Sequence, residues 1–505
     1  MKIDFAKNTK RNMIAAFGNS GVKLLFPFLN RTLFLWLLGP EYLGLNGLFG
    51  SILGMLMLAE LGFGMAVICS MYKPVAEDNR ELLCAYLNFY RKVYRCVGAA
   101  IFGIGLALLP FLRNLVHGDV PADINLHVLY LIHLVNTSAS YFLFAYRGSI
   151  LGAYHRNDVV NNIRTGVSVA QYLVVFLILL LTRNYYHYVL ATVVFTVAQN
   201  ILLVRASRRL FPEIEPRGHL EPGLRRQVIS DVKSIFMHRL GAVISNSADN
   251  IVIASTLGLV AVAAYGNYYY VITSVAGVIN AIHSSTQGGF GNKIYTETKD
   301  KTFELFMKAD RITLIVIAWC AAMMAALYDP FIEIWTKGDA ALSRHELTPV
   351  LMVVYFFVNQ SRKPLQTFKA AASLWRHDRW KPVVSSIFNL AMSFGAVFLL
   401  PDDYKLDGVI GATILSFAVV ELPWESHIVF HEFFGHARSA AYWRSHAVFA
   451  AFTLALCCAA FAAAHAIPIA GLIGLAIKGA VAAAAAGAIL VVAFRKDVMI
   501  ILKRI

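Results

Sequence analysis

The chain has 505 residues, of which 58% are hydrophobic and only 15% are charged. Its mean hydropathy of +0.61 excludes a water-soluble globular protein, because a folded core could not bury so much apolar surface. The net charge of +15 does not indicate a nucleic-acid partner, since Lys and Arg are spread over short polar segments and form no recognised binding motif.

Apolar stretches of about 20 residues, enough to cross ~30 Å of hydrocarbon as helices, recur from Met13 to Phe494 with short polar breaks. They predict an all-α membrane protein with 14 transmembrane helices. The expected spans lie near residues 13–38, 44–70, 94–115, 126–150, 163–182, 187–205, 234–257, 261–288, 311–333, 347–370, 382–400, 408–432, 445–467 and 470–494.

The distribution of basic residues predicts the orientation of these spans. With a cytosolic N-terminus, 36 of the 45 Lys and Arg residues fall in inner segments and only five fall in outer ones. The positive-inside rule then places both termini in the cytosol of a multi-pass protein in the cytoplasmic (inner) membrane. Within the inner segments, Glu81–Val97 has tyrosines on one helical face and cations on the other. This pattern predicts an amphipathic helix at the membrane surface before the third span.

Two correspondences indicate an internal duplication. The segment Arg31–Gly39 has the spacing of Asn250–Gly258, and Tyr154–Asp158 corresponds to Trp375–Arg379. The offsets are 219 and 221 residues, each equal to six spans. Because six is even, both halves enter the membrane in the same direction, which is typical of parallel repeats in transporters. We expect a six-helix lobe over 1–205, a cytosolic linker over 206–233, a second six-helix lobe over 234–434, and two additional helices with a tail over 435–505.

Polar side chains follow helical spacing inside four spans, one pair of spans in each half. An ionisable residue in hydrocarbon needs a partner or water, so these residues are candidates for a shared water-filled cavity. The candidate cations are Lys23, Arg31 and Arg239, and the other candidate cavity residues are Asn30, Asn136, Asp249, Asn250, His283 and Gln287.

Three carboxylates, Glu60, Asp249 and Glu421, are candidates for binding a coupling proton or sodium ion. The alternative is that they form salt bridges within the helix bundle, and the sequence leaves both roles open.

Motifs of soluble enzymes fail on spacing. The two histidines of His431–His436 are five residues apart, whereas a zinc-protease helix needs four to bring both onto one face. Glycines in Gly98–Gly105 lie within an apolar span without a preceding strand, so we expect them to allow close helix packing. We therefore predict no catalytic residue, metal or cofactor, and a transporter in place of an enzyme.

Five short motifs, in this order, resemble the polysaccharide flippases of the multidrug/oligosaccharidyl-lipid/polysaccharide exporter superfamily. They are Leu38–Phe49, Ala59–Gly64, Ser70–Pro74, Ala248–Asn250 and Leu374–Arg379. The resemblance implies a two-lobed bundle of helices that flips undecaprenyl-pyrophosphate-linked oligosaccharide to the outer leaflet by alternating access, in support of surface polysaccharide biosynthesis.

The resemblance also implies that Lys23, Arg31 and Arg239 contact the pyrophosphate. The implied partners are the lipid-linked oligosaccharide, membrane lipid and other polysaccharide assembly proteins. Asp249 stands where the first half has Asn30, so the expected cavity is not uniformly basic.

Two alternatives remain. A drug or cation antiporter of the same superfamily would need carboxylates in its cavity, which Glu60, Asp249 and Glu421 would supply. A membrane glycosyltransferase or polymerase would need catalytic residues in a sizeable outer loop, and the longest outer segment, Trp335–Leu347, has few charges. We rank the antiporter second and the enzyme third.

Overall fold

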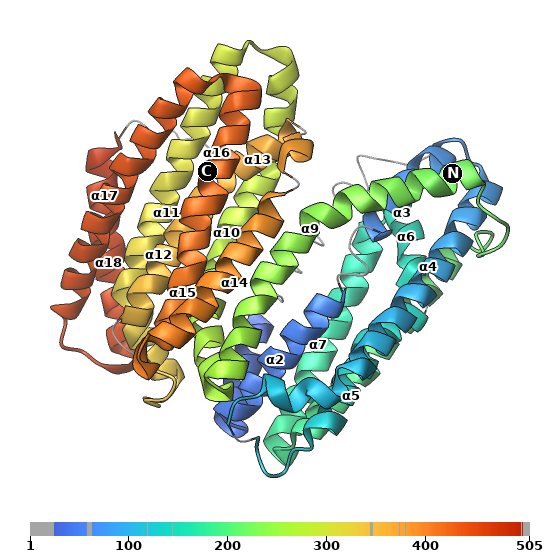
Figure 1. Ribbon diagram of the computed structural model, residues 1–505, viewed down its shortest axis with the longest axis horizontal. Helices are drawn as coiled ribbons and strands as arrows, with labels where there is room; N and C mark the ends of the chain where they lie inside the picture. Colours follow the sequence, from blue (N-terminus) through green and yellow to red (C-terminus); the bar gives the residue numbers. More distant parts are fainter. Residues whose placement is uncertain are drawn as a thin grey trace. The chain divides into compact units, whose positions relative to one another are not determined.

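The computed structural model describes residues 25–57, 63–118, 120–143, 145–343, 347–372, 374–378, 380–495 and 497. Every regular element in these ranges is a helix (Figure 1). The all-α fold class is therefore confirmed. By contacts, the chain forms two compact units, Met1–Leu259 and Val260–Ile505.

The first unit begins with the helix Leu25–Leu37. Its further helices are α2 (Pro40–Leu56), α3 (Phe63–Ala76), α4 (Arg80–Ala107), η2 (Leu109–Leu115), α5 (Leu126–Phe142), η3 (Ala145–Arg147), α6 (Gly148–Ala153), α7 (Asn157–Thr182), α8 (Tyr185–Leu210) and α9 (Pro222–Thr256). The long helix α9 packs against α2 and α3.

The second unit contains α10 (Leu259–Thr296), α11 (Lys299–Trp335), α12 (Leu347–Ser361), α13 (Lys363–Ala371), η4 (Leu374–Asp378), α14 (Lys381–Leu399), η5 (Asp402–Tyr404), α15 (Lys405–Leu415), η6 (Ser416–Glu421), α16 (Leu422–Val429), η7 (Phe430–Phe434), η8 (His436–Arg438), α17 (Ser439–His465) and α18 (Gly471–Ala493). The predicted domain limits at residues 205, 233 and 434 remain predictions, since the two units are divided by spatial contacts alone.

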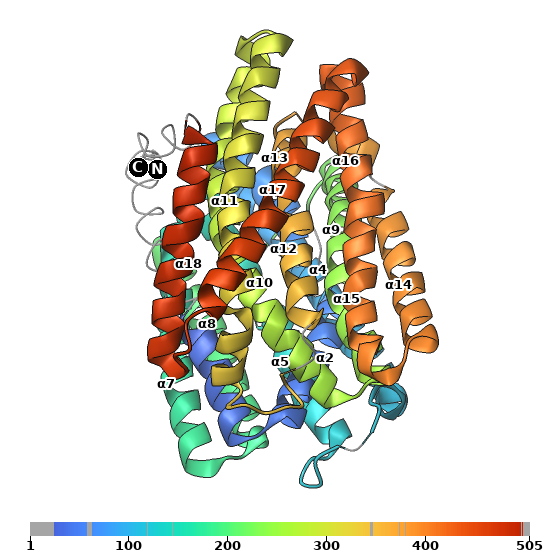
Figure 2. The same cartoon turned by 90° about the vertical axis from the view of Figure 1, so that its left-hand side faces the viewer.

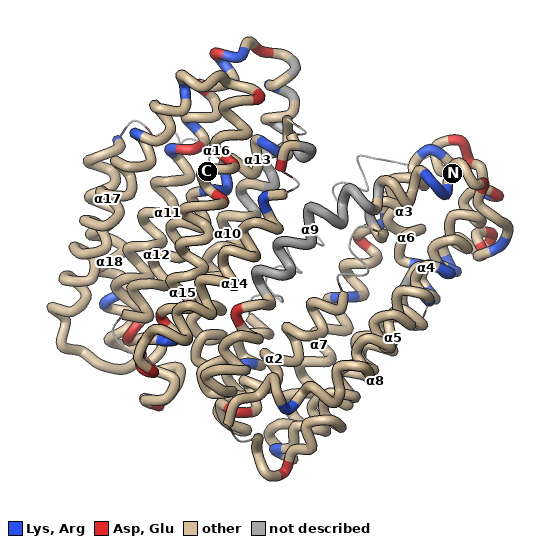
Figure 3. The backbone as a smooth tube through the Cα atoms, in the orientation of Figure 1, with Lys and Arg blue, Asp and Glu red and all other residues tan. Residues whose placement is uncertain are grey.

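Eight helical segments of the described chain are long and apolar enough to cross a membrane, and α4 and η2, bent by 60° at their junction, pass the same test together. Shorter apolar helices accompany them. Lys, Arg, Asp and Glu gather toward the ends of the helices, and the middle portions are nearly free of charge (Figure 3). The chain is thus a multi-pass membrane protein, and a total of about fourteen spans is consistent with these helices.

Two predicted spans are built from shorter helices. The span predicted over 126–150 consists of α5, η3 and α6, and that predicted over 347–370 consists of α12 and α13. In the second case Pro364 occupies the first turn of α13, where proline is tolerated because its nitrogen needs no helical partner.

The helix starts agree with the internal duplication. The helix α10 begins 219 residues after α2, α11 begins 219 residues after α4, and α12 begins 221 residues after α5. Corresponding helices therefore follow one another in the same order and at the same spacing in both halves.

The prediction of a separate surface helix over 81–97 is wrong. These residues belong to α4, which continues without a break to Ala107. No proline lies between Arg80 and Ala107, so nothing local ends the helix at the membrane surface. The shared tyrosine face is real, since Tyr86, Tyr90 and Tyr94 are all buried.

Candidate functional site

Six charged side chains gather inside the second unit, and we call them the charge cluster. They come from the α12–α13 junction, α13, η4, α14, η6 and α16, and each is at most 9% exposed. The members are Arg362, Lys369, Asp378, Lys381, Glu421 and Glu425.

Glu425 is fully buried and lies at the centre of the cluster. Arg362 donates to both of its carboxylate oxygens, from Nε at 3.1 Å and from Nη2 at 3.0 Å. Lys381 also donates to it, and Lys369 Nζ lies 3.7 Å away. Two-point binding by a guanidinium is among the strongest arrangements for a carboxylate, so this end of α16 is held firmly.

Glu421 forms salt bridges, which is one of the two roles that the sequence left open for it; the other is binding of a coupling ion. It lies at the end of the π-helical η6, pairs with Arg362, and has Lys381 Nζ at 3.5 Å. Ser385 Oγ donates to its other oxygen at 2.6 Å. A coupling role for Glu421 stays a prediction.

The charge cluster is balanced, with three cations and three carboxylates. Lys369 pairs with Asp378, which completes the set. Buried ions are costly to desolvate, and mutual pairing compensates that cost. The cluster therefore suits a structural role and offers no surplus charge to an anionic ligand.

Lys363, next to Arg362, differs from the cluster. It is half-buried, and its Nζ donates to Gln366 Oε1 at 3.2 Å. Within the described chain no carboxylate lies within ion-pair distance of its ammonium group. His283 is nearby and buried, hydrogen-bonded to Thr313 at 3.1 Å and Thr367 at 3.2 Å. Lys363 thus hydrogen-bonds a neutral amide, and Glu425 and Glu421 act on its charge from beyond ion-pair distance.

Lys363 was not among the predicted site residues. The sequence signal was present but ambiguous, because Lys363 falls in the basic stretch 362–381, which hydropathy treats only as an inner-side topology signal. Six Lys and Arg residues in this short segment are more than the positive-inside rule needs to orient the neighbouring spans. The extra basic residues indicate that some of them have a second role.

Predicted cavity residues of the first unit are hydrogen-bonded within it. Asn30 Nδ2 donates to Tyr188 at 2.9 Å, and Asn136 Nδ2 approaches Thr192 Oγ1 at 3.5 Å. Asn250 Nδ2 donates to Ser51 Oγ at 2.9 Å. Arg31 is half-buried on the helix Leu25–Leu37, and Asp249 is 3% exposed.

Of these residues Asp249 is buried, and Asn30, Arg31, Asn136 and Asn250 are half-buried. Lys23 and Glu60 lie outside the described residues, and so do the side chains of Arg239 and Gln287. A shared cavity lined by the predicted residues remains a prediction.

Three histidines lie close together in and near the segment His431–His436, whose spacing does not match a zinc-protease motif. The ring centroids of His427, His431 and His436 are 4.9 to 5.5 Å apart. Glu432 accepts from His431 Nδ1 at 2.9 Å. The described residues nevertheless contain no group of three or more ligands arranged to hold a metal ion.

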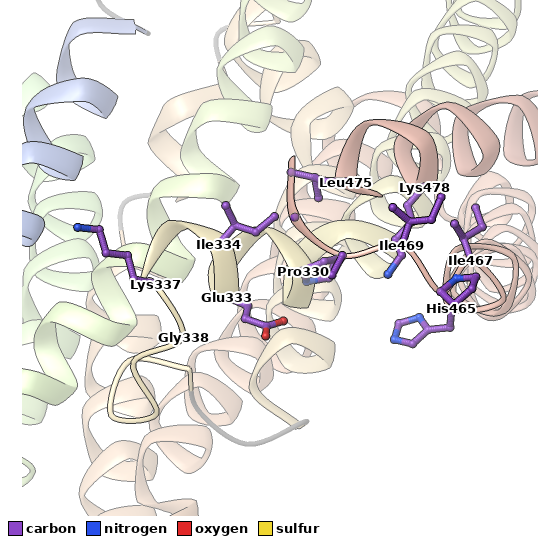
Figure 4. Close-up of a pocket in the computed structure, with 13 residues that line it drawn as sticks. Pro330, Glu333, Ile334, Lys337, Gly338, His465, Ile467, Ile469, Leu475 and Lys478 are labelled. Carbon is purple, nitrogen blue, oxygen red and sulfur yellow. The ribbon is translucent and has the colours of Figure 1, made fainter. Parts of the chain in front are cut away.

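Two cavities open within the units. In the second unit, a cavity of about 590 Å³ lies where α11 ends beside the α17–α18 turn, and Glu333, His465 and Lys478 line it (Figure 4). In the first unit, a cavity of about 400 Å³ lies along α4, with Lys92 and Arg225 around an apolar floor that includes Phe63 and Phe89.

A family model described as polysaccharide biosynthesis protein matches residues 9–286, which is more than half of the chain. The chain belongs to the polysaccharide biosynthesis protein family. No curated protein matches the sequence.

Solved structures show which fold this family member has. It is similar to the lipid II flippase MurJ in an inward closed conformation, with a TM-score of 0.63 and 12% identity over 97% of this chain and 99% of that one. It also resembles an inward-facing MATE family transporter of the MOP superfamily, with a TM-score of 0.59 and 14% identity over 80% and 94%. A Vibrio cholerae MATE transporter matches with a TM-score of 0.54 and 13% identity over 84% and 97%. The fold is that of MOP superfamily transporters.

Proposed function

We propose that the protein flips an undecaprenyl-pyrophosphate-linked oligosaccharide from the inner to the outer leaflet of the cytoplasmic membrane, by alternating access, for surface polysaccharide biosynthesis. The observation that supports this most is the family match combined with a fold shared with a lipid II flippase. Both termini lie in the cytosol in this proposal, and other polysaccharide assembly proteins are candidate partners.

The charge of the ligand fits the cations of the two units. A pyrophosphate is recognised by Lys and Arg side chains through charge-assisted hydrogen bonds. Lys363 supplies such a cation in the second unit, since its recorded bond is to the neutral Gln366. Arg31, half-buried on the helix Leu25–Leu37, is the cation proposed to contact the pyrophosphate in the first unit, and Lys23 and Arg239 extend the set.

The experiment is complementation of a deletion in the native host with Lys363→Gln or Arg31→Gln. We expect each variant to accumulate normally in the membrane and to lose surface polysaccharide, while complete lipid-linked repeat units build up facing the cytosol. Lys301→Gln is the matched control, because Lys301 is exposed and pairs with Glu297. Normal export by both site variants would overturn the assigned roles.

The second candidate function is a drug or cation antiporter, favoured by the fold shared with MATE transporters and by the buried Asp249. The same deletion separates the two functions. Intact surface polysaccharide combined with hypersensitivity to cationic drugs would favour the antiporter. Loss of polysaccharide without completed lipid-linked units would instead indicate a glycosyltransferase, and build-up of completed units on the outer face would indicate a polymerase.

A further inference from the structure

Asp310 is a fully buried carboxylate inside the second unit. It is 0% exposed, and among the described residues neither of its oxygens receives a hydrogen bond. It lies on the stripe of α11 that continues through Leu314, Ala318, Ala322 and Ala326, at a spacing of four residues. This stripe packs against α17 and α18 (Figure 2), so Asp310 stands in an apolar helix interface.

His446 is a titratable side chain on the facing helix α17. Its Nδ1 lies 3.7 Å from Asp310 Oδ2, too far for a hydrogen bond, and donates at 3.2 Å to the backbone oxygen of Tyr442. The backbone of Ser361, at the end of α12, is a second hydrogen-bond partner of the His446 ring. The imidazole therefore faces Asp310 without neutralising it.

The other charged groups around this pair are few. The ring centroids of Tyr442 and His446 are 4.0 Å apart with the planes tilted by 36°. The charges acting on the Tyr442 hydroxyl are those of Asp310, Glu425 and Arg362. Arg311 follows Asp310 on α11 but is exposed. The facing part of α18 contributes apolar residues, namely Ala482, Ala486 and Leu490.

We propose that Asp310 and His446 form a proton-binding site between α11 and α17, in which Asp310 carries a proton at neutral pH. A carboxyl group buried without hydrogen-bond donors favours its neutral form. Release converts the carboxylic acid to a carboxylate and one proton. The carboxylate becomes stable only when water enters between α11 and α17 or when His446 accepts the proton. Proton occupancy is thereby tied to the packing of α17 on α11.

A proton bound at this site would drive transport, and this role rests on the proposed function. Proton binding itself does not depend on the proposed function. Asp310 differs in its charged partners from Glu421, one of the carboxylates predicted from the sequence to bind a coupling ion. Glu421 has two cationic partners, Arg362 and Lys381. Asp310 has none within hydrogen-bonding distance among the described residues.

Infrared difference spectroscopy of the full chain in lipid nanodiscs tests proton binding directly. At about pH 7, where an exposed Asp is ionised, we expect the C=O stretch of a protonated carboxylic acid that is absent from Asp310→Asn. Asp300→Asn is the matched control, since Asp300 lies on the same helix but is 78% exposed and pairs with Arg438. A spectrum of Asp310→Asn identical to that of the native chain at this pH would overturn the proposal.

His446→Gln tests the second member of the site. Without an imidazole to accept the proton, the carboxylate is harder to form, so the C=O band should persist to higher pH than in the native chain. An unmoved midpoint would remove His446 from the site. In the deletion host, Asp310→Asn should lose polysaccharide export at normal membrane abundance; normal export by a variant that lacks the band would overturn the driving role alone.

Discussion

Glu425 balances three cations in the interior of the second unit, and this position makes it sensitive to loss of charge. Removing one partner from a buried ion cluster leaves uncompensated charge and costs about 3–5 kcal/mol. We therefore expect Glu425→Gln to lower the melting temperature of the purified protein strongly, as measured by thermal unfolding in detergent.

Glu432→Gln serves as the control for that prediction, because Glu432 is partly exposed and its ion pairs among the described residues are with His377 and His431. Its melting temperature should match that of the native chain. A native-like melting temperature for Glu425→Gln would show that the cluster does not depend on its central carboxylate.

Sequence reasoning identified single polar residues more readily than their partners. Glu421 was recognised as a buried carboxylate, but its partner Arg362 is 59 residues away and had been assigned to orientation. Asp310 was missed because hydropathy starts the predicted span at residue 311, which leaves this carboxylate outside the apolar stretch. The available signal was that Asp310 continues, at a spacing of four residues, the apolar stripe that runs through Leu314 and Ala318.

The pairing of α4 with α5 depends on glycine. A Cβ added at Gly98 would lie 2.7 Å from Tyr141 Cβ, whereas one added at Gly103 would meet nothing within 4 Å. Overpacking of this kind costs about 1–3 kcal/mol, and alanine in a helix is favoured over glycine by ~1 kcal/mol. We expect Gly98→Ala to lower the melting temperature and Gly103→Ala to leave it unchanged or raise it. Equal melting temperatures would contradict close packing at Gly98.

Helices were predictable as elements because long apolar stretches allow few alternatives in lipid. The breaks within the predicted spans were harder to predict. The bend between α4 and η2 lies beside Pro110, which provides a local signal, but the break between α5 and α6 has no proline to mark it. Such a break depends on tertiary contacts, for example the buried Arg147 that pairs with Glu215.

At the scale of the whole molecule, the repeat was predictable because two short motifs shared an offset that helix starts later reproduced. The grouping of helices into units was harder to predict. The helix α9 begins the second repeat by sequence, yet it packs with α2 and α3. Repeat order specifies which helices correspond, whereas side-chain fit determines which helices pack together.

Orientation in the membrane is the remaining property of the whole chain, and cysteine labelling measures it. The segment between α8 and α9 contains the exposed His219, and the segment after α11 contains the exposed Asp339. Basic residues concentrate around the first of these, so the positive-inside rule places it in the cytosol and the second outside. In a chain whose native cysteines are replaced, a membrane-impermeant maleimide should label Asp339→Cys in intact cells.

His219→Cys should react only after the membrane is permeabilised, and both variants should react equally once it is. The reverse pattern would place both termini outside and would contradict the proposed direction of flipping. Labelling of His219→Cys and Asp339→Cys from the same side would mean that the chain crosses the membrane an even number of times between them. The odd number expected from spans seven, eight and nine makes this a direct test of the helix count in that part of the chain.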